Sequence, residues 1–339
     1  MCLVNIYNTV KVFVVESSRV SSVSNANSLT IWKKLDSNML TVSLVPTFWC
    51  DGHCPYCYLG DLRKDDTVIS NEVLDSRLEE LSKRFDISVD IFGGNVEKSV
   101  DNTTLIKMVD TVRKYTDKVS LTTMLEDGYD TIRVPLSVSL NEERGHIHTQ
   151  TLERLKAMDS NLRKTVTVMM VVLPSLLKKE YGVILDSIES LGIKSVTFLQ
   201  YYKSYRCKKV YDISNKDYEN FMIGIIDAYR KKDYSFSIGN LDIWTDNYVP
   251  LRSSNIFILP NGQYATLEYD KDGYEEFRYF DSLSEYEDSI SEEIVENSDC
   301  LCCEMFGQCL AEHIRPTING DVCSGLPNLR NHLETIGIV

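Results

Sequence analysis

The sequence predicts an α/β protein in which short strands and helices alternate to build a parallel sheet. Six short apolar runs occur between residues 39 and 201, and segments with apolar residues at helical spacing separate and follow them. This alternation is typical of strand–helix–strand units. The run TVTVMMVVL at 165–173 is apolar throughout, as expected of a strand buried on both faces. Both an open doubly wound sheet and a partial barrel fit the pattern.

The expected elements follow one another in chain order. Each strand is an apolar or β-branched run, and each helix has apolar residues three and four positions apart. The expected strands cover residues 39–45, 87–92, 119–124, 132–140, 165–173 and 196–201. The expected helices cover residues 71–85, 105–112, 149–158, 177–191 and 217–231. Ligands bind at the carboxyl ends of parallel strands, so the segments that follow the strands are the candidate site.

The sequence changes character near residue 245. Pro260-Asn261-Gly262 separates two apolar runs, at 255–259 and 263–269, and this pattern indicates a hairpin. Residues 268–299 then hold 13 Asp or Glu and 2 Lys or Arg, which is −11 of the total charge of −14. We read this stretch as a solvated acidic face. The rest of the chain therefore carries −3, so net charge is a weak argument against nucleic acid.

The N-terminus, the lack of a predicted membrane span and the spacing of the cysteines predict a cytoplasmic protein. No run of about 18 apolar residues predicts a membrane span. The N-terminus has no basic start and no small-residue cleavage site, so we expect no signal peptide. Structural disulfides are rare in the cytosol, and closely spaced cysteines there more often bind metal or do chemistry.

Three of the ten cysteines lie close together after the first expected strand. Cys50, Cys54 and Cys57 have the spacing C-x3-C-x2-C. Three thiolates can hold an iron–sulfur cubane and leave one iron open, which suits catalysis. The alternatives are a zinc site, completed by His53 or a distant residue, and chance clustering.

This first group resembles the signature of the radical S-adenosylmethionine (radical SAM) superfamily, CxxxCxΦC, with Tyr56 at the aromatic position. The resemblance implies a partial (β/α)6 TIM-like barrel, a [4Fe–4S] cluster on Cys50, Cys54 and Cys57, and SAM bound to the open iron. It also implies that reductive cleavage of SAM gives a 5′-deoxyadenosyl radical, which abstracts hydrogen from the substrate.

Further segments resemble that family in the same order. Phe92-Gly93-Gly94-Asn95 is similar to the GGE motif that binds the SAM amino group, with Asn95 in place of the acid. The ends of the third and fourth strands resemble the "TTNG" and "SLDG…R" segments. The cofactor contacts implied by the resemblance are Tyr56, Gly93, Gly94, Asn95, Thr122, Ser139 and Asn141. No catalytic residue of the chain is assigned.

The second cysteine group resembles the C-terminal SPASM/twitch extension of radical SAM enzymes. Its pattern is C-x2-C-x5-C followed by one later cysteine, and the implied ligands are Cys300, Cys303, Cys309 and Cys323. Other cysteines of a full extension are missing, so we expect one auxiliary [4Fe–4S] cluster. Cys302 is a bystander or an alternative ligand. A four-cysteine zinc site is the rival interpretation.

We therefore expect an N-terminal extension at 1–38, a radical SAM partial barrel at 39–245, and a small cysteine-rich α+β auxiliary domain at 246–339. The expected function is hydrogen abstraction from a peptide or protein, leading to cross-linking or epimerisation. A reductant such as flavodoxin or ferredoxin is the expected partner, and nucleic acid is disfavoured. The alternatives are a dehydrogenase or rearrangement enzyme for a sugar or nucleotide, and a non-catalytic metal-binding module.

Overall fold

The computed structural model describes residues 14–16, 19–21, 39–245, 255–296 and 321–338. They form a ten-stranded sheet of order β12-β11-β10-β3-β4-β5-β6-β7-β8-β9, and β1 (Val14–Glu16) and β2 (Arg19–Ser21) pair separately. Seven strands run parallel in chain order, namely β3 (Met39–Leu44), β4 (Asp86–Ile91), β5 (Val119–Thr123), β6 (Leu136–Ser139), β7 (Thr167–Val171), β8 (Ser195–Leu199) and β9 (Ser237–Ile238).

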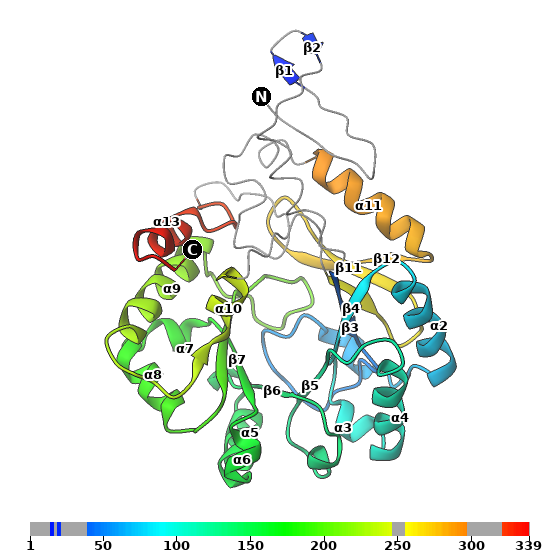
Figure 1. The fold of residues 1–339 in the computed structure, drawn as a ribbon, viewed down its shortest axis with the longest axis horizontal. Coiled ribbons are helices and arrows are strands. Elements are labelled where there is room, and N and C mark those ends of the chain that lie inside the picture. The colour runs from blue at the N-terminus through cyan, green and yellow to red at the C-terminus, as the bar shows by residue number, and fades with distance from the viewer. Residues whose placement is uncertain (1–13, 17–18, 22–38, 246–254, 297–320, 339) are drawn as a thin grey trace.

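Helices cover the outside of this sheet (Figure 1). The longer helices that follow the strands are α2 (Asn71–Ser82), α4 (Asn102–Val112), α5 (His146–Ala157), α8 (Tyr181–Glu189) and α9 (Asn215–Tyr229). Shorter helices are α3 (Val96–Ser99), α6 (Ser160–Arg163), α7 (Pro174–Leu177), α10 (Gly239–Thr245), η1 (Gly60–Lys64), η2 (Tyr129–Thr131) and η3 (Glu142–Arg144). The expected alternation of strands and helices is confirmed, and none of the described helices is long and apolar enough to cross a bilayer.

Strands β3, β4, β5 and β6 each have an apolar face and a face that carries hydroxyl side chains. In β3, Leu40 and Val42 are buried in the main core, whereas Thr41 between them is half-buried. The same alternation recurs in β4, β5 and β6. The apolar face therefore packs against the helices and the hydroxyl face lines the inside of the sheet. The expectation that strand 165–173 is buried on both faces is wrong, because only Val168 of β7 is fully buried.

Two differences between the expected and observed strands have local causes. Strand β6 begins at Leu136 instead of residue 132, because Pro135 has no N–H to donate within a ladder. The stretch at 268–299, which was expected to be a solvated acidic face, contains β12 (Glu275–Phe280). In this strand Glu275, Phe277 and Phe280 are buried. The second half of the stretch is α11 (Leu283–Glu296).

The expected hairpin is confirmed and joins the barrel sheet. Strand β10 (Asn255–Ile258) pairs antiparallel with β11 (Tyr264–Tyr269) and parallel with β3. Residue Ile258 lies opposite Leu44, at the end of β3 from which the first cysteine loop departs. The division at residue 245 stays a prediction, and the sheet runs across it.

The C-terminal helix α13 (Pro327–Thr335) packs against α9 (Figure 1). The buried carboxylate of Glu219 in α9 accepts hydrogen bonds from the backbone N–H groups of Asn328 and Leu329, at 2.7 and 2.9 Å. These are first-turn donors that the helix itself leaves unpaired. The segment at 321–338 is thereby fixed to the barrel.

Candidate functional site

The first cysteine group lies on a tightly bonded loop at the carboxyl end of β3. The N–H of Cys50 donates to the carbonyl oxygen of Arg63 at 3.1 Å, and the Arg63 guanidinium donates to the carbonyl oxygen of Gly52 at 2.8 Å. The N–H of Cys57 donates to the carbonyl oxygen of Cys54 at 3.3 Å. These bonds hold the three half-buried, unbridged thiols on one short segment.

The three thiols are close enough to affect one another electrically. Burial raises the pKa of Cys57 to about 12, and Cys54 and Cys50 add to the rise. Burial and Cys54 likewise raise the pKa of Cys50, while Arg144 opposes the rise. A bound metal centre deprotonates its thiol ligands and removes this repulsion. The donor set therefore fits an iron–sulfur cluster.

Among the described residues, no three His, Cys, Asp or Glu side chains converge closely enough to hold one metal ion. A cubane needs no such convergence, because its cysteines bind different irons.

The Gly93-Gly94-Asn95 segment packs directly on the cysteine loop. The N–H of Gly94 donates to the carbonyl oxygen of Thr47 at 3.1 Å, and that of Asn95 donates to the carbonyl oxygen of Trp49 at 2.8 Å. A Cβ at Gly94 would lie 1.8 Å from the Trp49 oxygen, and one at Gly93, whose φ is +147°, would lie 2.7 Å from the Thr47 oxygen. The glycines therefore allow close approach of the loop backbone.

Asn95 presents a buried acceptor beside the loop. Its Nδ2 donates to Asp51 Oδ1 at 3.0 Å, and its Oδ1 is buried without a hydrogen-bond partner in the described part of the chain. Asp51 Oδ2 also accepts from Lys98 Nζ at 2.7 Å. Burial favours the neutral acid, but the bonds from Lys98 and Asn95 outweigh it and hold the pKa of Asp51 below its ordinary value.

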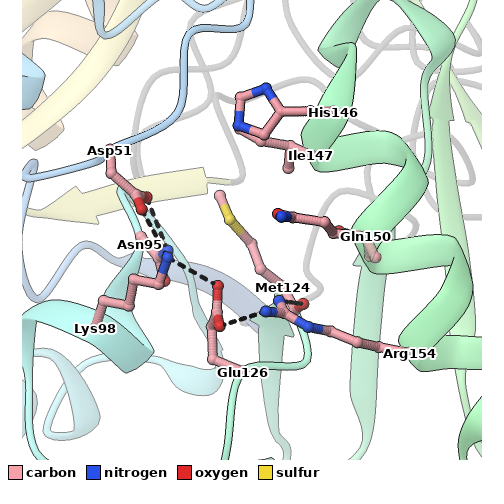
Figure 2. A pocket seen from close by; sticks show the side chains of 10 residues that line it. Asp51, Asn95, Lys98, Met124, Glu126, His146, Ile147, Gln150 and Arg154 are labelled. Carbon is pink, nitrogen blue, oxygen red and sulfur yellow. Dashed lines mark hydrogen bonds and ion pairs between the residues drawn. The ribbon is translucent and has the colours of Figure 1, made fainter.

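These side chains line a cavity of about 150 Å³ at the mouth of the barrel (Figure 2). Its wall also carries Glu126, which pairs with Lys98 at 3.3 Å and with Arg154 at 2.8 Å. Pockets for drug-sized ligands usually measure about 300–1,000 Å³. The cavity therefore suits an amino-acid-sized group, and its two acids and two bases form a network of ion pairs with one another.

Tyr56, Asn141 and Val171 form one hydrogen-bonded cluster, which we call the Asn141 latch. The Tyr56 hydroxyl donates to Asn141 Oδ1 at 3.3 Å. Asn141 Oδ1 also accepts from the N–H of Val171 at 3.1 Å, while its Nδ2 donates to the Val171 carbonyl oxygen at 2.7 Å. The Asn141 amide thus joins the cysteine loop, the end of β6 and the end of β7.

Thr122 and Ser139 lie on the hydroxyl faces of β5 and β6, where both are half-buried. The carbonyl oxygen of Ser139 accepts a hydrogen bond from the buried guanidinium of Arg144. The structure therefore brings the cysteine loop, Asn95 and the ends of β5 and β6 to one end of the barrel. Contacts of these residues with a cofactor stay predictions.

One member of the second cysteine group lies within the described residues. Cys323 is half-buried, and the N–H of Gly325 donates to its Sγ at 3.3 Å. The neighbouring Asp321 accepts from the N–H groups of Asn215 and Lys216 at the start of α9. Cys323 is therefore held near the carboxyl end of β8, the strand that precedes α9. Cys300, Cys302, Cys303 and Cys309 lie outside the described residues.

Sequence reasoning did not find the charged residues of the cavity. Asp51 and Lys98 lie one and three residues from motif residues, so that adjacency is the signal that could have found them. Glu126 and Arg154 are 28 positions apart and match no local pattern. Only the fold brings these two together.

Three solved structures resemble this chain. Streptococcus suis SuiB bound to S-adenosylmethionine has 14% identity and a TM-score of 0.61, over 85% of this chain and 77% of SuiB. The same protein bound to precursor peptide SuiA has a TM-score of 0.59 at 14% identity, over 89% of this chain and 80% of SuiB.

The third is native anSMEcpe with bound AdoMet and Cp18Cys peptide, with 14% identity and a TM-score of 0.59, over 88% of this chain and 99% of anSMEcpe. At these identities the likeness establishes the fold, and the expected α/β barrel-type fold is confirmed. No protein-family model and no curated protein matches the sequence.

Proposed function

We propose that this chain, whose fold is that of radical SAM enzymes, is itself a radical SAM enzyme that modifies a peptide or protein. One observation carries the proposal. Three unbridged cysteines leave the end of β3 directly beside Asn95, which lines an amino-acid-sized cavity and whose buried Oδ1 has no partner in the described chain. A cluster site and a site for the methionine end of SAM are thus adjacent.

The chain's own residues have distinct tasks in this proposal. Cys50, Cys54 and Cys57 hold a [4Fe–4S] cluster, and the Gly93–Asn95 segment fixes the wall against which SAM binds. Together, the bound cluster and SAM supply the 5′-deoxyadenosyl radical. The protein contributes orientation and exclusion of water, as is usual where a cofactor carries out the difficult chemistry. Thr122 and Ser139 are proposed contacts to SAM from the strand ends.

The roles of Tyr56 and Asn141 follow from their bonding. Asn141 Oδ1 already accepts two hydrogen bonds, so we assign both residues to holding the cluster loop against the barrel. Burial raises the pKa of Cys50, and the buried Arg144 places a positive charge near this thiol that opposes part of the rise.

The proposed substrate is a peptide or protein. SuiB is seen with precursor peptide SuiA, and anSMEcpe with the Cp18Cys peptide, and this chain covers at least 80% of each of those two structures. The proposed outcome is a cross-link or an epimerised residue. A flavodoxin or ferredoxin is the proposed source of electrons.

We also propose one auxiliary [4Fe–4S] cluster on Cys300, Cys303, Cys309 and Cys323. Its support is the position of Cys323, which α9 and α13 hold near the carboxyl end of β8. This is the end of the barrel that carries the first cysteine group. A backbone N–H directed at Sγ is also a feature that tunes cluster thiolates.

Anaerobic reconstitution with iron and sulfide, followed by dithionite and SAM, tests the function. We expect about eight irons per chain, four for each [4Fe–4S] cluster, and 5′-deoxyadenosine that depends on the reductant. The Cys54→Ala variant should form none, while the Cys2→Ala variant, which alters a thiol outside the proposed ligands, should retain both iron and product. Bound zinc, or iron without SAM cleavage, would contradict the enzyme assignment.

A further inference from the structure

The chain lacks the acid that its SAM-binding motif leads one to expect. Asn95 takes that place, and an amide carries no charge to offset an ammonium group. Glu97 lies two residues later, but its carboxylate accepts from the Thr123 hydroxyl and from the N–H of Met124. Glu97 is not among the residues that line the cavity. The missing charge must therefore come from another element.

Asp51 stands where it can supply that charge. Its carboxylate accepts from Asn95 Nδ2 at 3.0 Å, and Figure 2 shows the two side chains meeting at one wall of the cavity. A carboxylate only accepts hydrogen bonds, so it selects the amide orientation in which Nδ2 faces Asp51. Asn95 Oδ1 then remains for another donor, and it has none in the described chain.

The burial of Asn95 makes this free acceptor informative. Its side chain is 1% exposed, and a buried acceptor without a donor is unfavourable. A ligand N–H group in the cavity would remove the deficit. The amide, polarised by the carboxylate behind it, accepts more strongly than an isolated amide.

We propose that Asp51 and Asn95 act as one unit that binds the α-ammonium group of SAM. Asn95 Oδ1 is the direct acceptor, and Asp51 is the positioning residue that fixes the amide and supplies its negative charge. Arg154 and Lys98 also line the cavity, and the carboxylate of the same amino-acid group would share these cations with Glu126 and Asp51. This inference rests on the proposed radical SAM function and adds Asp51 to it.

The binding test compares SAM with its desamino analogue on anaerobically reconstituted protein, by isothermal titration calorimetry. In the Asp51→Asn variant we expect about tenfold weaker binding of SAM and unchanged binding of the analogue. The Asn95→Glu variant should also bind SAM more weakly, because two carboxylates then meet. The double variant with Asn95→Glu and Asp51→Asn restores one acid, and its affinity should return to within about threefold of the wild type.

Two controls separate this role from a structural one. Iron content must match the wild type in every variant, because Asp51 follows the cluster ligand Cys50. The Lys98→Met variant removes the cation from Asp51, and it should keep or increase the preference for SAM over the analogue. If Lys98→Met instead loses that preference as Asp51→Asn does, the ion pair is the cause and the inference is overturned.

Equal binding of SAM by wild type and Asp51→Asn, or parallel loss of SAM and analogue, overturns the inference and leaves the proposed function standing. Failure of the wild-type protein to bind SAM overturns both.

Discussion

The backbone N–H of Glu275 donates to the carbonyl oxygen of Lys203 at 2.7 Å, and this bond links segments from opposite ends of the sheet order. Lys203 follows β8, near one edge of the sheet, and Glu275 begins β12 at the other edge. Lys203 and Tyr274 also form a β-bridge. The loop that follows β8 therefore contacts the start of β12.

Tyr205 supports this contact and supplies the first prediction. Its ring stacks on Tyr274 with centroids 4.1 Å apart, and its hydroxyl donates to Asp270. The Tyr205→Ala variant should lower the free energy of unfolding by about 0.5–1.5 kcal/mol. It should also speed hydrogen exchange at the Glu275 amide, measured by mass spectrometry. The control is Val183→Ala, since Val183 is 57% exposed. Unchanged exchange at Glu275 would show that the stack does not hold the contact between Lys203 and Glu275.

The buried carboxylate of Glu275 makes the stability of the fold depend on pH. Burial raises its pKa from 4.5 to about 8, and a bond from Tyr269 offsets only part of the rise. Between these values the folded state binds more protons than the unfolded state, so the stability of the fold falls as pH rises from about 4.5 to 8. The slope from this group is at most about 1.4 kcal/mol per pH unit.

The Glu275→Gln variant should flatten this part of the stability profile, as measured by urea unfolding at several pH values. The matched control is Glu276→Gln, which changes an exposed neighbour on the same strand. A slope identical in Glu275→Gln and the wild type would contradict the assigned pKa.

Gly94 allows a third prediction, on how the two motifs pack. A Cβ at this position would lie 1.8 Å from the Trp49 carbonyl oxygen, so the cysteine loop must move away in the Gly94→Ala variant. We expect a loss of about 1–3 kcal/mol or more and a fall in bound iron. Gly182→Ala is the control, because nothing lies within 4 Å of its added Cβ. Thermal unfolding measures the loss of stability, and iron analysis measures the bound iron. A normal iron content in Gly94→Ala would show that the packing at Gly94 does not control the cysteine loop.

The Asn141 latch yields a fourth prediction. The Asn141→Ala variant leaves the N–H and carbonyl groups of Val171 without their side-chain partner, which should cost about 1–3 kcal/mol. Tyr56→Phe removes one hydroxyl bond and should cost about 0.5–1.5 kcal/mol. Urea unfolding of both variants measures the difference. A larger loss in Tyr56→Phe than in Asn141→Ala would mean that Asn141 does not organise the latch.

A fifth prediction concerns the second cysteine group. Cys309→Ala should reduce iron from about eight to about four per chain and leave the first cluster intact. Iron analysis with Mössbauer spectroscopy measures this, and Cys302→Ala is the matched control because Cys302 is outside the proposed ligand set. Unchanged iron in Cys309→Ala would show that the auxiliary assignment is wrong.

The six central strands could be predicted from sequence because each is a short apolar or β-branched run, such as residues 39–45. The placement of β12 could not, because it lies in an acidic stretch and its buried residues, Glu275, Phe277 and Phe280, do not alternate regularly with exposed ones. Strand β9, at two residues, is too short to give a pattern. The pairing of β10 with β3 joins residues more than 200 positions apart, and no local pattern encodes it.

Within the candidate site, the cysteines and Gly93–Asn95 were found because each follows a strand at a fixed motif spacing. The Asp51 contact with Asn95 spans 44 positions and depends on how the two loops pack. The same holds for the ion pairs of Glu126. Sequence therefore identified the parts of the site with local spacing, and the fold supplied those that meet only in space.

Electron paramagnetic resonance of the dithionite-reduced Cys309→Ala variant, with and without SAM, tests the central claim most directly. In that variant the cluster on Cys50, Cys54 and Cys57 is the expected source of the signal. Binding of SAM to its open iron should shift the g values, and the Cys54→Ala change should remove the signal. A cluster spectrum that is the same with and without saturating SAM would contradict the claim that this loop builds a SAM-binding centre.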